Sequence, residues 1–194
     1  MAKRAVRRKK AVVEETNTTR IYLIYGSIAL VALFLLGLLI YSLREPEGIA
    51  DLVIVPGVDR GHDNSLVYEP AAAPRLGGPH HDAWLNCGVY NEPVTEANVL
   101  HSLEHGAIWL TYNESLPSDE VAALEAYGRD LSYIIVSPYP SQEDPVVLTG
   151  WGVQLSVDDV DDRRVDTFIE RYRQGPQTPE RGAACTGGVG VPVG

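Results

Sequence analysis

The chain has 194 residues, enough for one folded domain beside a membrane anchor and too few for two domains with sizeable cores. Its net charge is −10, and the part from Arg44 onward contains no lysine, with nine arginines against 24 acidic residues. Such an acidic surface argues against nucleic acid or anionic lipid as a partner of this part, and the single methionine, Met1, excludes a methionine-rich copper(I) site.

The N-terminal region combines a basic tail with a long apolar run. Residues 1–20 hold seven lysines and arginines against two glutamates, and residues 21–43 contain neither a charged residue nor a proline. An α-helix of that length spans the hydrocarbon core of a bilayer, which is about 30 Å thick. Since a basic end stays in the cytoplasm, the sequence predicts a single-pass helix at 21–43 in the cell membrane, with a cytoplasmic N-terminus and an extracytoplasmic C-terminal part.

A cleaved signal peptide is the alternative interpretation of the same segment. Its apolar region would be about 7–15 residues long and would end at a small-residue cleavage site. Here the run is longer, and Arg44-Glu45-Pro46 follows it. The pattern therefore favours a retained anchor, followed by a linker at 44–50.

The first half of the outer part combines short strands with a long loop. Residues 50–55 and 65–68 are typical of strands, while 69–93 is rich in Pro, Gly, Ala and Asn and is expected to be a loop. Loops of this length tend to be functional or disordered. Residues 95–105 then predict a helix, with Thr95 as its N-cap and Gly106 just beyond its end.

The second half of the outer part mixes strands and helices. One helix is expected to begin at a capping Ser118 and to end near Arg129, and an amphipathic helix is expected over 161–173. Strands are expected at 107–112, 133–136, 146–151 and 153–157. Together the elements predict an α+β domain over 51–185, with a mixed or mostly antiparallel sheet and two to three helices, before a Gly/Pro-rich tail at 186–194.

All five histidines lie between positions 62 and 105, and the densest group is the segment 101–105, with the sequence HSLEH. Residues four apart share one helix face, so His101 and His105 can converge on one ion, with Glu104 at its edge. The pattern H-x-x-E-H is also the zinc motif of the inverzincin peptidases. His105 has a structural alternative, because an imidazole in the last helical turn can cap backbone carbonyls.

The loop before this helix adds further candidates. His80 and His81 follow two glycines and a proline, and glycines let the backbone approach a site closely. The predicted metal site comprises His80, His101, His105 and Glu104, with His62 and His81 as further candidates. One of the two adjacent histidines is expected to lie in a solvated turn instead. Neutral imidazole suits several divalent transition metals, of which zinc and copper are the leading candidates.

The two cysteines, Cys87 and Cys185, allow two interpretations. As a thiolate, Cys87 could join the metal site. As a disulfide, the pair would close a loop of about 100 residues and stabilise the fold by about 4–5 kcal/mol on the chain-entropy model. An extracytoplasmic compartment and an even cysteine count favour the disulfide.

Several segments of the outer part carry a family resemblance: GGPH at 77–80, Trp84, NCGVY at 86–90, HSLEHG at 101–106, SPYP at 137–140 and GPQTPE at 175–180. In these segments the chain resembles domain-of-unknown-function family 3105, a group of bacterial proteins of which many are membrane-anchored. His62 also falls where the family tends to have a histidine, whereas 74–76 lacks the second proline expected before the glycines. The resemblance implies an anchored extracytoplasmic domain without an established activity.

The sequence is compatible with three functions. The leading one is an extracytoplasmic metal-binding module, such as a metal carrier or an accessory subunit of a membrane complex. The second is a zinc hydrolase with Glu104 as general base, although Glu114, Glu120 and Glu125 are nearer than expected for a third ligand, so a non-enzyme is favoured. The third is a metal-free domain whose acidic surface holds a basic protein.

Overall fold

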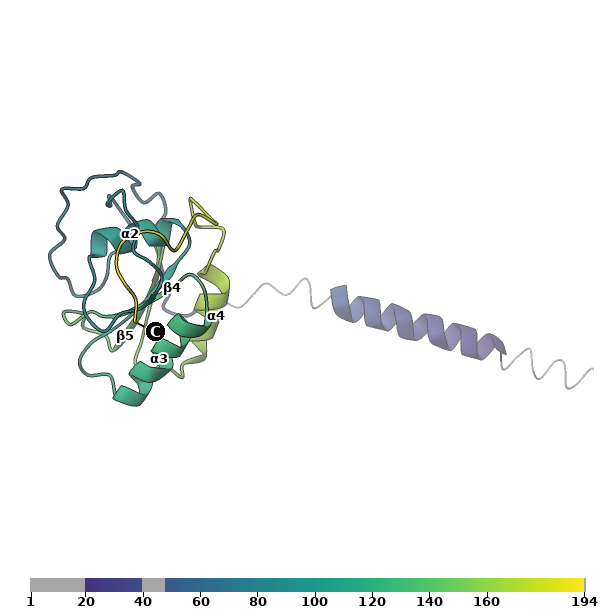
Figure 1. Cartoon of the computed structure of the whole chain (residues 1–194). Helices are drawn as coiled ribbons and strands as arrows, with labels where there is room; N and C mark the ends of the chain where they lie inside the picture. Colours follow the sequence, from purple (N-terminus) through teal and green to yellow (C-terminus); the bar gives the residue numbers. More distant parts are fainter. Residues whose placement is uncertain (1–19, 40–47, 194) are drawn as a thin grey trace, which may run out of the picture. The chain divides into compact units, whose positions relative to one another are not determined.

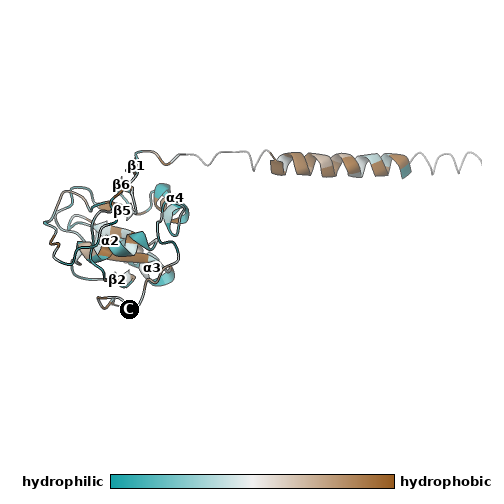
Figure 2. Ribbon diagram, turned by 90° about the horizontal axis from the view of Figure 1, so that it is seen from above, coloured by the Kyte–Doolittle hydropathy of each residue, from teal (hydrophilic) through white to brown (hydrophobic). Residues whose placement is uncertain are grey.

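The computed structural model describes residues 20–39 and 48–193, which belong to two units, Met1–Gly48 and Ile49–Gly194 (Figure 1). The expected basic tail up to residue 19, the end of the expected span and start of the linker at 40–47, and Gly194 lie outside the described residues. In the first unit, Arg20–Leu39 forms a helix with mean hydropathy 2.4, apolar along most of its length (Figure 2). Its 20 residues suffice to cross a membrane, a property that anchors share with signal sequences.

The second unit contains one six-stranded sheet with the order β1-β6-β5-β3-β4-β2. The strands are β1 Val53–Ile54, β2 Gly88–Val89, β3 Ile108–Tyr112, β4 Ile134–Pro138, β5 Val146–Gly150 and β6 Val153–Val157. β4 pairs in parallel with both β2 and β3, whereas the pairs β3–β5, β5–β6 and β6–β1 are antiparallel. The predicted α+β class with a mixed sheet is therefore confirmed.

Two local features of the sequence explain the centre of this sheet. The parallel strands β3 and β4 are joined by a helical crossover, which parallel pairing requires. The antiparallel β5 and β6 turn at Trp151-Gly152, a two-residue hairpin loop. Gly152 has φ +70°, and a Cβ there would meet the Val55 carbonyl oxygen at 2.8 Å, so this position requires glycine.

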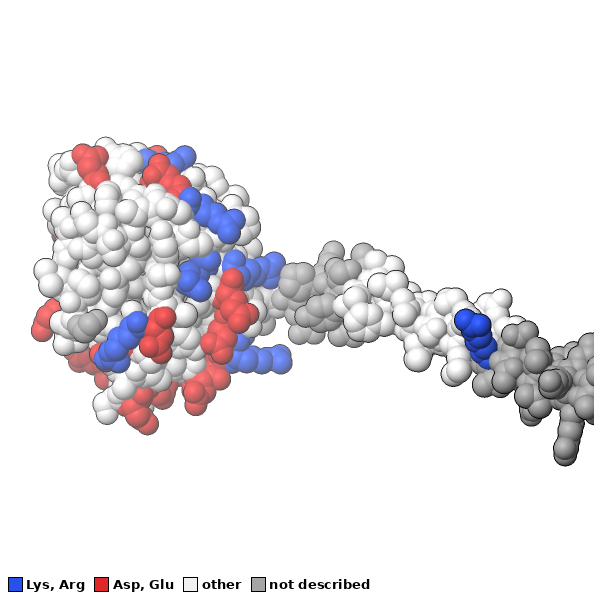
Figure 3. All heavy atoms as spheres, turned by 45° about the vertical axis from the view of Figure 1, so that its right-hand side comes forward, with Lys and Arg blue, Asp and Glu red and all other residues white. Residues whose placement is uncertain are grey.

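Three helices pack on the sheet: α2 Glu96–Glu104, α3 Ser118–Asp130 and α4 Arg163–Tyr172. All three were predicted within a few residues of these bounds. The outer sides of α3 and α4 carry charges of both signs, such as the ion pairs Arg129–Glu125 and Arg164–Asp162. On the face drawn in Figure 3, arginine side chains likewise lie among acidic ones.

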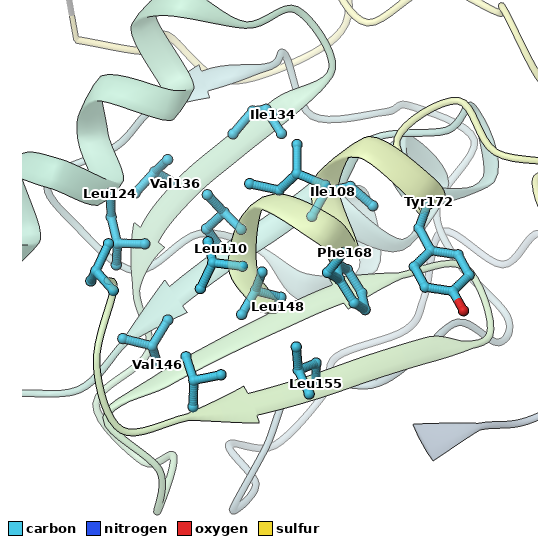
Figure 4. Close-up of a cluster of buried hydrophobic side chains, with 14 of the residues drawn as sticks. Ile108, Leu110, Leu124, Ile134, Val136, Val146, Leu148, Leu155, Phe168 and Tyr172 are labelled. Carbon is cyan, nitrogen blue, oxygen red and sulfur yellow. The ribbon is translucent and has the colours of Figure 1, made fainter. Parts of the chain in front are cut away.

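The helices divide between the two faces of the sheet. On one face, here called the α3/α4 face, Leu124 and Phe168 pack against strand residues such as Leu110 and Leu148 (Figure 4). On the other, the α2 face, Leu100 and Leu103 pack against the alternate strand residues, such as Trp109 and Ile135. This division follows from the period of two along each strand, which sends successive side chains to opposite faces.

Three expectations about local structure need correction. Residues 65–68 are not a strand: the backbone N–H and hydroxyl of Ser65 both donate to Asp63 Oδ1 in a turn at Asn64–Ser65, and residues 66–68 have no regular structure. The strand expected at 50–55 is only Val53–Ile54, which lies at the edge of the sheet. Ser118 is the first residue of α3 rather than its cap; Pro117 takes the cap position, without a side-chain hydrogen bond.

The C-terminal segment returns to the α2 face. The Val193 N–H donates to the Val89 carbonyl at 2.7 Å, and Val189 forms a parallel bridge with Leu85. Cys87 and Cys185 lie as a disulfide pair with Cα atoms 5.4 Å apart, within the usual range for this bond. The tail up to residue 193 is thus held against the domain by backbone hydrogen bonds.

Candidate metal centre

Helix α2 brings three candidate ligands to one place. His101 and Glu104 lie in its last turn, His105 is its C-cap residue, and all three side chains are buried. The His105 imidazole was alternatively expected to cap carbonyls at the end of the helix. Instead, the side chain of Gln174 caps the carbonyl of His105, to which its Nε2 donates at 2.6 Å. The His105 ring is therefore available for a different contact.

The loop before α2 delivers two more histidines. His62 and His80 form a parallel bridge, and the His80 N–H donates to the Gly61 carbonyl at 2.9 Å. The loop turns at Gly77 and Gly78, which have φ values of +136° and +127° that side-chain-bearing residues rarely adopt. This path places the His80 ring fully buried, with centroids 4.5 Å from His62 and 4.9 Å from the His101 ring.

Three of the imidazoles are held in the same tautomer by backbone carbonyls. The Nδ1···O contacts are His80 to Gly78 at 2.8 Å, His101 to His81 at 2.7 Å and His105 to Ala184 at 2.6 Å. Because a carbonyl can only accept, each Nδ1 carries a proton, and in the neutral ring each Nε2 presents a lone pair. Metal-binding histidines in proteins are oriented in this way. Burial also lowers the pKa of His101, which keeps its ring in the neutral form that binds metals.

One contact in this group is unsatisfied. His80 Nε2 and Glu104 Oε2 lie 3.0 Å apart, which is within ion-pair distance. Their relative orientation is nevertheless not that of a hydrogen bond, and neither atom has a hydrogen-bond partner in the part of the chain that the structure describes. Both side chains are buried, so with a neutral His80 ring two atoms that carry lone pairs face each other away from water. Buried polar atoms without partners are rare and call for an explanation.

The potential ligand atoms form two overlapping groups. The first comprises His62, His80, His101 and Glu104, and the second comprises His101, His105 and Glu180. Within each group all ligand atoms lie within 4.8 Å of one another, close enough to bind one ion. His101 belongs to both groups, and its ring stacks edge-on against that of His105, with centroids 4.5 Å apart.

Arg60 connects the carboxylates of the two groups. Its Nε donates to Glu104 Oε1, and its Nη2 donates to Glu180 Oε1 at 3.0 Å. The other oxygens, both Oε2, are the ones nearest the histidines: Glu104 Oε2 faces His80, and Glu180 Oε2 lies 3.7 Å from His105 Nε2. The guanidinium thus holds both carboxylates with one oxygen directed at an imidazole.

Two of the expected candidates lie outside these groups. His81 Nε2 bonds to the Leu66 carbonyl at 2.9 Å, and the half-buried residue has no turn assignment, so the expected solvated turn is not found at His81. Cys87 is paired with Cys185 and does not contribute a thiolate. The pair instead supports the site from a distance, because Ala184, whose carbonyl orients His105, precedes Cys185.

Sequence reasoning missed Arg60 and Glu180. Both are far from α2 along the chain, at separations of 44 residues for Arg60–Glu104 and 120 residues for Arg60–Glu180. One signal was present, because Glu180 ends the segment GPQTPE that was noted for its family resemblance. Arg60 stands two residues before His62, and no pattern in the sequence singled it out.

Comparison with known proteins places the site within a family. Residues 62–187 match the family described as Protein of unknown function (DUF3105), and this segment contains every candidate ligand. No curated protein and no solved structure matches the chain. Because the match covers more than half of the 194 residues, the chain belongs to this family of proteins of unknown function.

Proposed function

We propose that the domain binds one divalent transition metal ion, zinc or copper(II), through His80, His101 and Glu104, with His62 as the fourth ligand. The observation that carries this proposal is the pair of buried atoms, His80 Nε2 and Glu104 Oε2, which face each other without a hydrogen bond. An ion between them would turn an unfavourable contact into two coordinate bonds. Three imidazoles and one carboxylate also make a complete tetrahedral ligand set for zinc.

A metal-free alternative is that His80 is protonated at both nitrogens and pairs with Glu104. Two features make this the weaker explanation. Glu104 already has a cationic partner in Arg60. In addition, an Nε2–H bond to the carboxylate would need an orientation that the two side chains do not have. A metal ion fits better because His101 and His62 each offer a ligand atom within 4.8 Å of those of His80 and Glu104.

The proposed cellular role rests on the N-terminal helix. The helix at Arg20–Leu39 is long and apolar enough to span a membrane, and the basic residues before it favour a cytoplasmic N-terminus. We therefore place the metal-binding domain outside the cytoplasm, as a metal carrier or as an accessory subunit of a membrane complex. The surface offers less support for an acidic docking protein, because arginines lie among the acidic side chains on the face seen in Figure 3.

Metal content of the full chain, purified in detergent, tests the central proposal. We expect one equivalent of zinc or copper after loading, and its loss in His80→Asn and His101→Asn. Asparagine keeps a side-chain N–H for the backbone carbonyl but removes the Nε2 ligand, so the variants should fold. Glu104→Gln should weaken metal binding about 10–100-fold or more, since changes even behind the ligands have effects of that size.

His81→Gln is the matched control for these variants. Its ring lies in the same loop but outside both ligand groups, and it bonds to the Leu66 carbonyl, a donor role that glutamine can take over. We expect unchanged metal content in this variant. If the wild-type chain binds no metal, or if neither asparagine variant alters the content, the site is structural and the metal-free interaction domain becomes the better explanation.

A zinc hydrolase remains a second candidate because of one structural finding. Glu180 is a downstream acid that forms a group with His101 and His105, and Glu104 lies outside that group, where a hydrolase would use it as the base. Two features oppose it: the Glu104 side chain is only 1% exposed, and Arg60 occupies one of its oxygens. If Glu104→Gln retains full zinc affinity but abolishes a measurable peptidase or esterase activity, the hydrolase is the correct assignment.

Membrane orientation is tested separately. Protease added to intact spheroplasts should digest the C-terminal domain and leave an N-terminal tag protected. Release of a mature domain that begins after the apolar segment would instead identify the helix as a signal sequence.

A further inference from the structure

The two groups of ligands share one residue, and that residue can serve only one of them at a time. His101 Nδ1 is bonded to the His81 carbonyl, which leaves Nε2 as the only lone pair that the ring can offer. We infer that the bound ion has two alternative positions, one with His62, His80 and Glu104 and one with His105 and Glu180. The ion stays bound to His101 while it moves from one position to the other. This inference rests on the proposed metal binding and adds a route by which the ion enters and leaves.

The charges of the surrounding side chains favour one ion that alternates between the two positions over two ions bound together. Two divalent ions would have to share a region that contains two carboxylates, Glu104 and Glu180, and the guanidinium of Arg60 between them. The two negative charges of the carboxylates balance one divalent ion, and the positive charge of Arg60 already offsets part of the charge of the carboxylates. Coulomb repulsion between ions a few ångströms apart is large wherever water is scarce, so a second ion would be bound far more weakly.

The number of ligands decides which position is occupied at rest. The group around His80 offers four ligand atoms, whereas the group around His105 offers three. The first group is also the more enclosed on its carboxylate side, because Glu104 is 1% exposed and Glu180 is 43% exposed. The ion is therefore held at the four-ligand position, and the three-ligand position is the exposed step through which it exchanges.

Arg60 prepares both carboxylates for this exchange. It bonds Oε1 of Glu104 and Oε1 of Glu180, and so keeps the Oε2 atom of each directed at a histidine. An ion can thus gain bonds to His105 and Glu180 before it has lost all those to His80 and Glu104. Stepwise replacement of ligands avoids an intermediate with few bonds, which would make release slow.

Zinc exchange measured on the full chain in detergent tests the inference. The variant is His105→Asn/Glu180→Gln, in which asparagine can still donate to the Ala184 carbonyl and glutamine can still accept from Arg60. Release of Zn²⁺ to an excess of chromophoric chelator is followed by stopped flow, and the dissociation constant is measured by competition. We expect binding and release both to slow by about tenfold, equivalent to about 1.4 kcal/mol of activation free energy, while the dissociation constant is unchanged.

Each other outcome has a distinct meaning. Unchanged rates in the double variant would overturn the exchange route and leave the proposed metal site intact. Two zinc ions per wild-type chain, reduced to one in the variant, would show that the positions are filled together, and a large loss of affinity would show that His105 and Glu180 bind the ion at rest. If the wild-type chain binds no zinc at all, the metal site itself fails. Glu114→Gln, at an exposed acid outside both ligand groups, is the control and should match the wild type in rate and affinity.

Discussion

The two faces of the sheet are stabilised in different ways. The α3/α4 face is a continuous apolar core in which side chains such as Phe168 and Leu148 are fully buried. The α2 face buries apolar residues too, but it also buries His80, Glu104 and His105. Burial of apolar area stabilises the first face whatever else is bound. The second face must satisfy its polar groups one by one, because each buried polar atom without a partner is costly.

The two faces also differ in how they are built. The α3/α4 face is covered by two regular helices, whereas much of the α2 face is covered by the irregular segment 56–87 and the C-terminal segment. Ordering each residue of these segments costs conformational entropy, which the contacts of the segment must offset. We therefore expect the α2 face to depend on a cross-link and an ion, and the α3/α4 face to depend on neither.

Removal of the cross-link should have the largest effect. Cys87 and Cys185 are 98 residues apart, so Cys87→Ser/Cys185→Ser should lower the free energy of unfolding by about 4–5 kcal/mol on the chain-entropy model. Amide hydrogen exchange should show the loss of protection mainly in the segments of the α2 face. Peptide mapping without reduction should recover the two cysteines as one linked pair; two thiols that alkylate without reduction would contradict the disulfide.

Truncation of a core side chain on the opposite face should act almost as strongly, but without effect on the metal site. Phe168 is fully buried between α4 and the sheet, so Phe168→Ala should cost about 3–5 kcal/mol in denaturant unfolding. The zinc affinity of the folded variant should equal that of the wild type. A parallel fall in affinity would show that the two faces are coupled, contrary to the comparison above.

Metal should give a smaller stabilisation, confined to chains with an intact site. With free zinc at 100 times the dissociation constant, the free energy of unfolding should rise by about 2.7 kcal/mol, because only the folded state holds the ligands together. His101→Asn should show no such rise, and Phe168→Ala should show all of it. An equal rise in His101→Asn would mean that the stabilising zinc binds elsewhere.

Much of the fold could be predicted because its signals are local. Helix α2 was expected at 95–105 and is found at Glu96–Glu104, since an apolar side, a terminal glycine and a polar start all lie within one segment. β6 was expected at 153–157 and has those bounds. The segment 65–68 was misread because a short apolar pattern resembles a strand, whereas hydrogen bonds from Ser65 to Asp63 form a turn at its start.

The candidate site could be predicted only in part, for a related reason. His101, Glu104 and His105 share one helix, so their spacing alone brings them together. The contributions of Arg60 and Glu180 depend on where the fold places two distant segments. No periodic pattern in the sequence indicates that placement. The choice between His80 and His81 likewise depended on the backbone bridge to His62 and not on residue type.

The two edges of the sheet have a consequence for how copies of the chain behave beside one another. β1 and β2 are each only two residues long, whereas the four strands between them have five. β1 is followed closely by Pro56, and the backbone of Val89 in β2 already accepts a hydrogen bond from Val193. A neighbouring copy therefore finds little free backbone on which to add a strand, which protects the protein from edge-to-edge aggregation. With the proposed membrane anchor, chains crowded on one surface would benefit most from this protection.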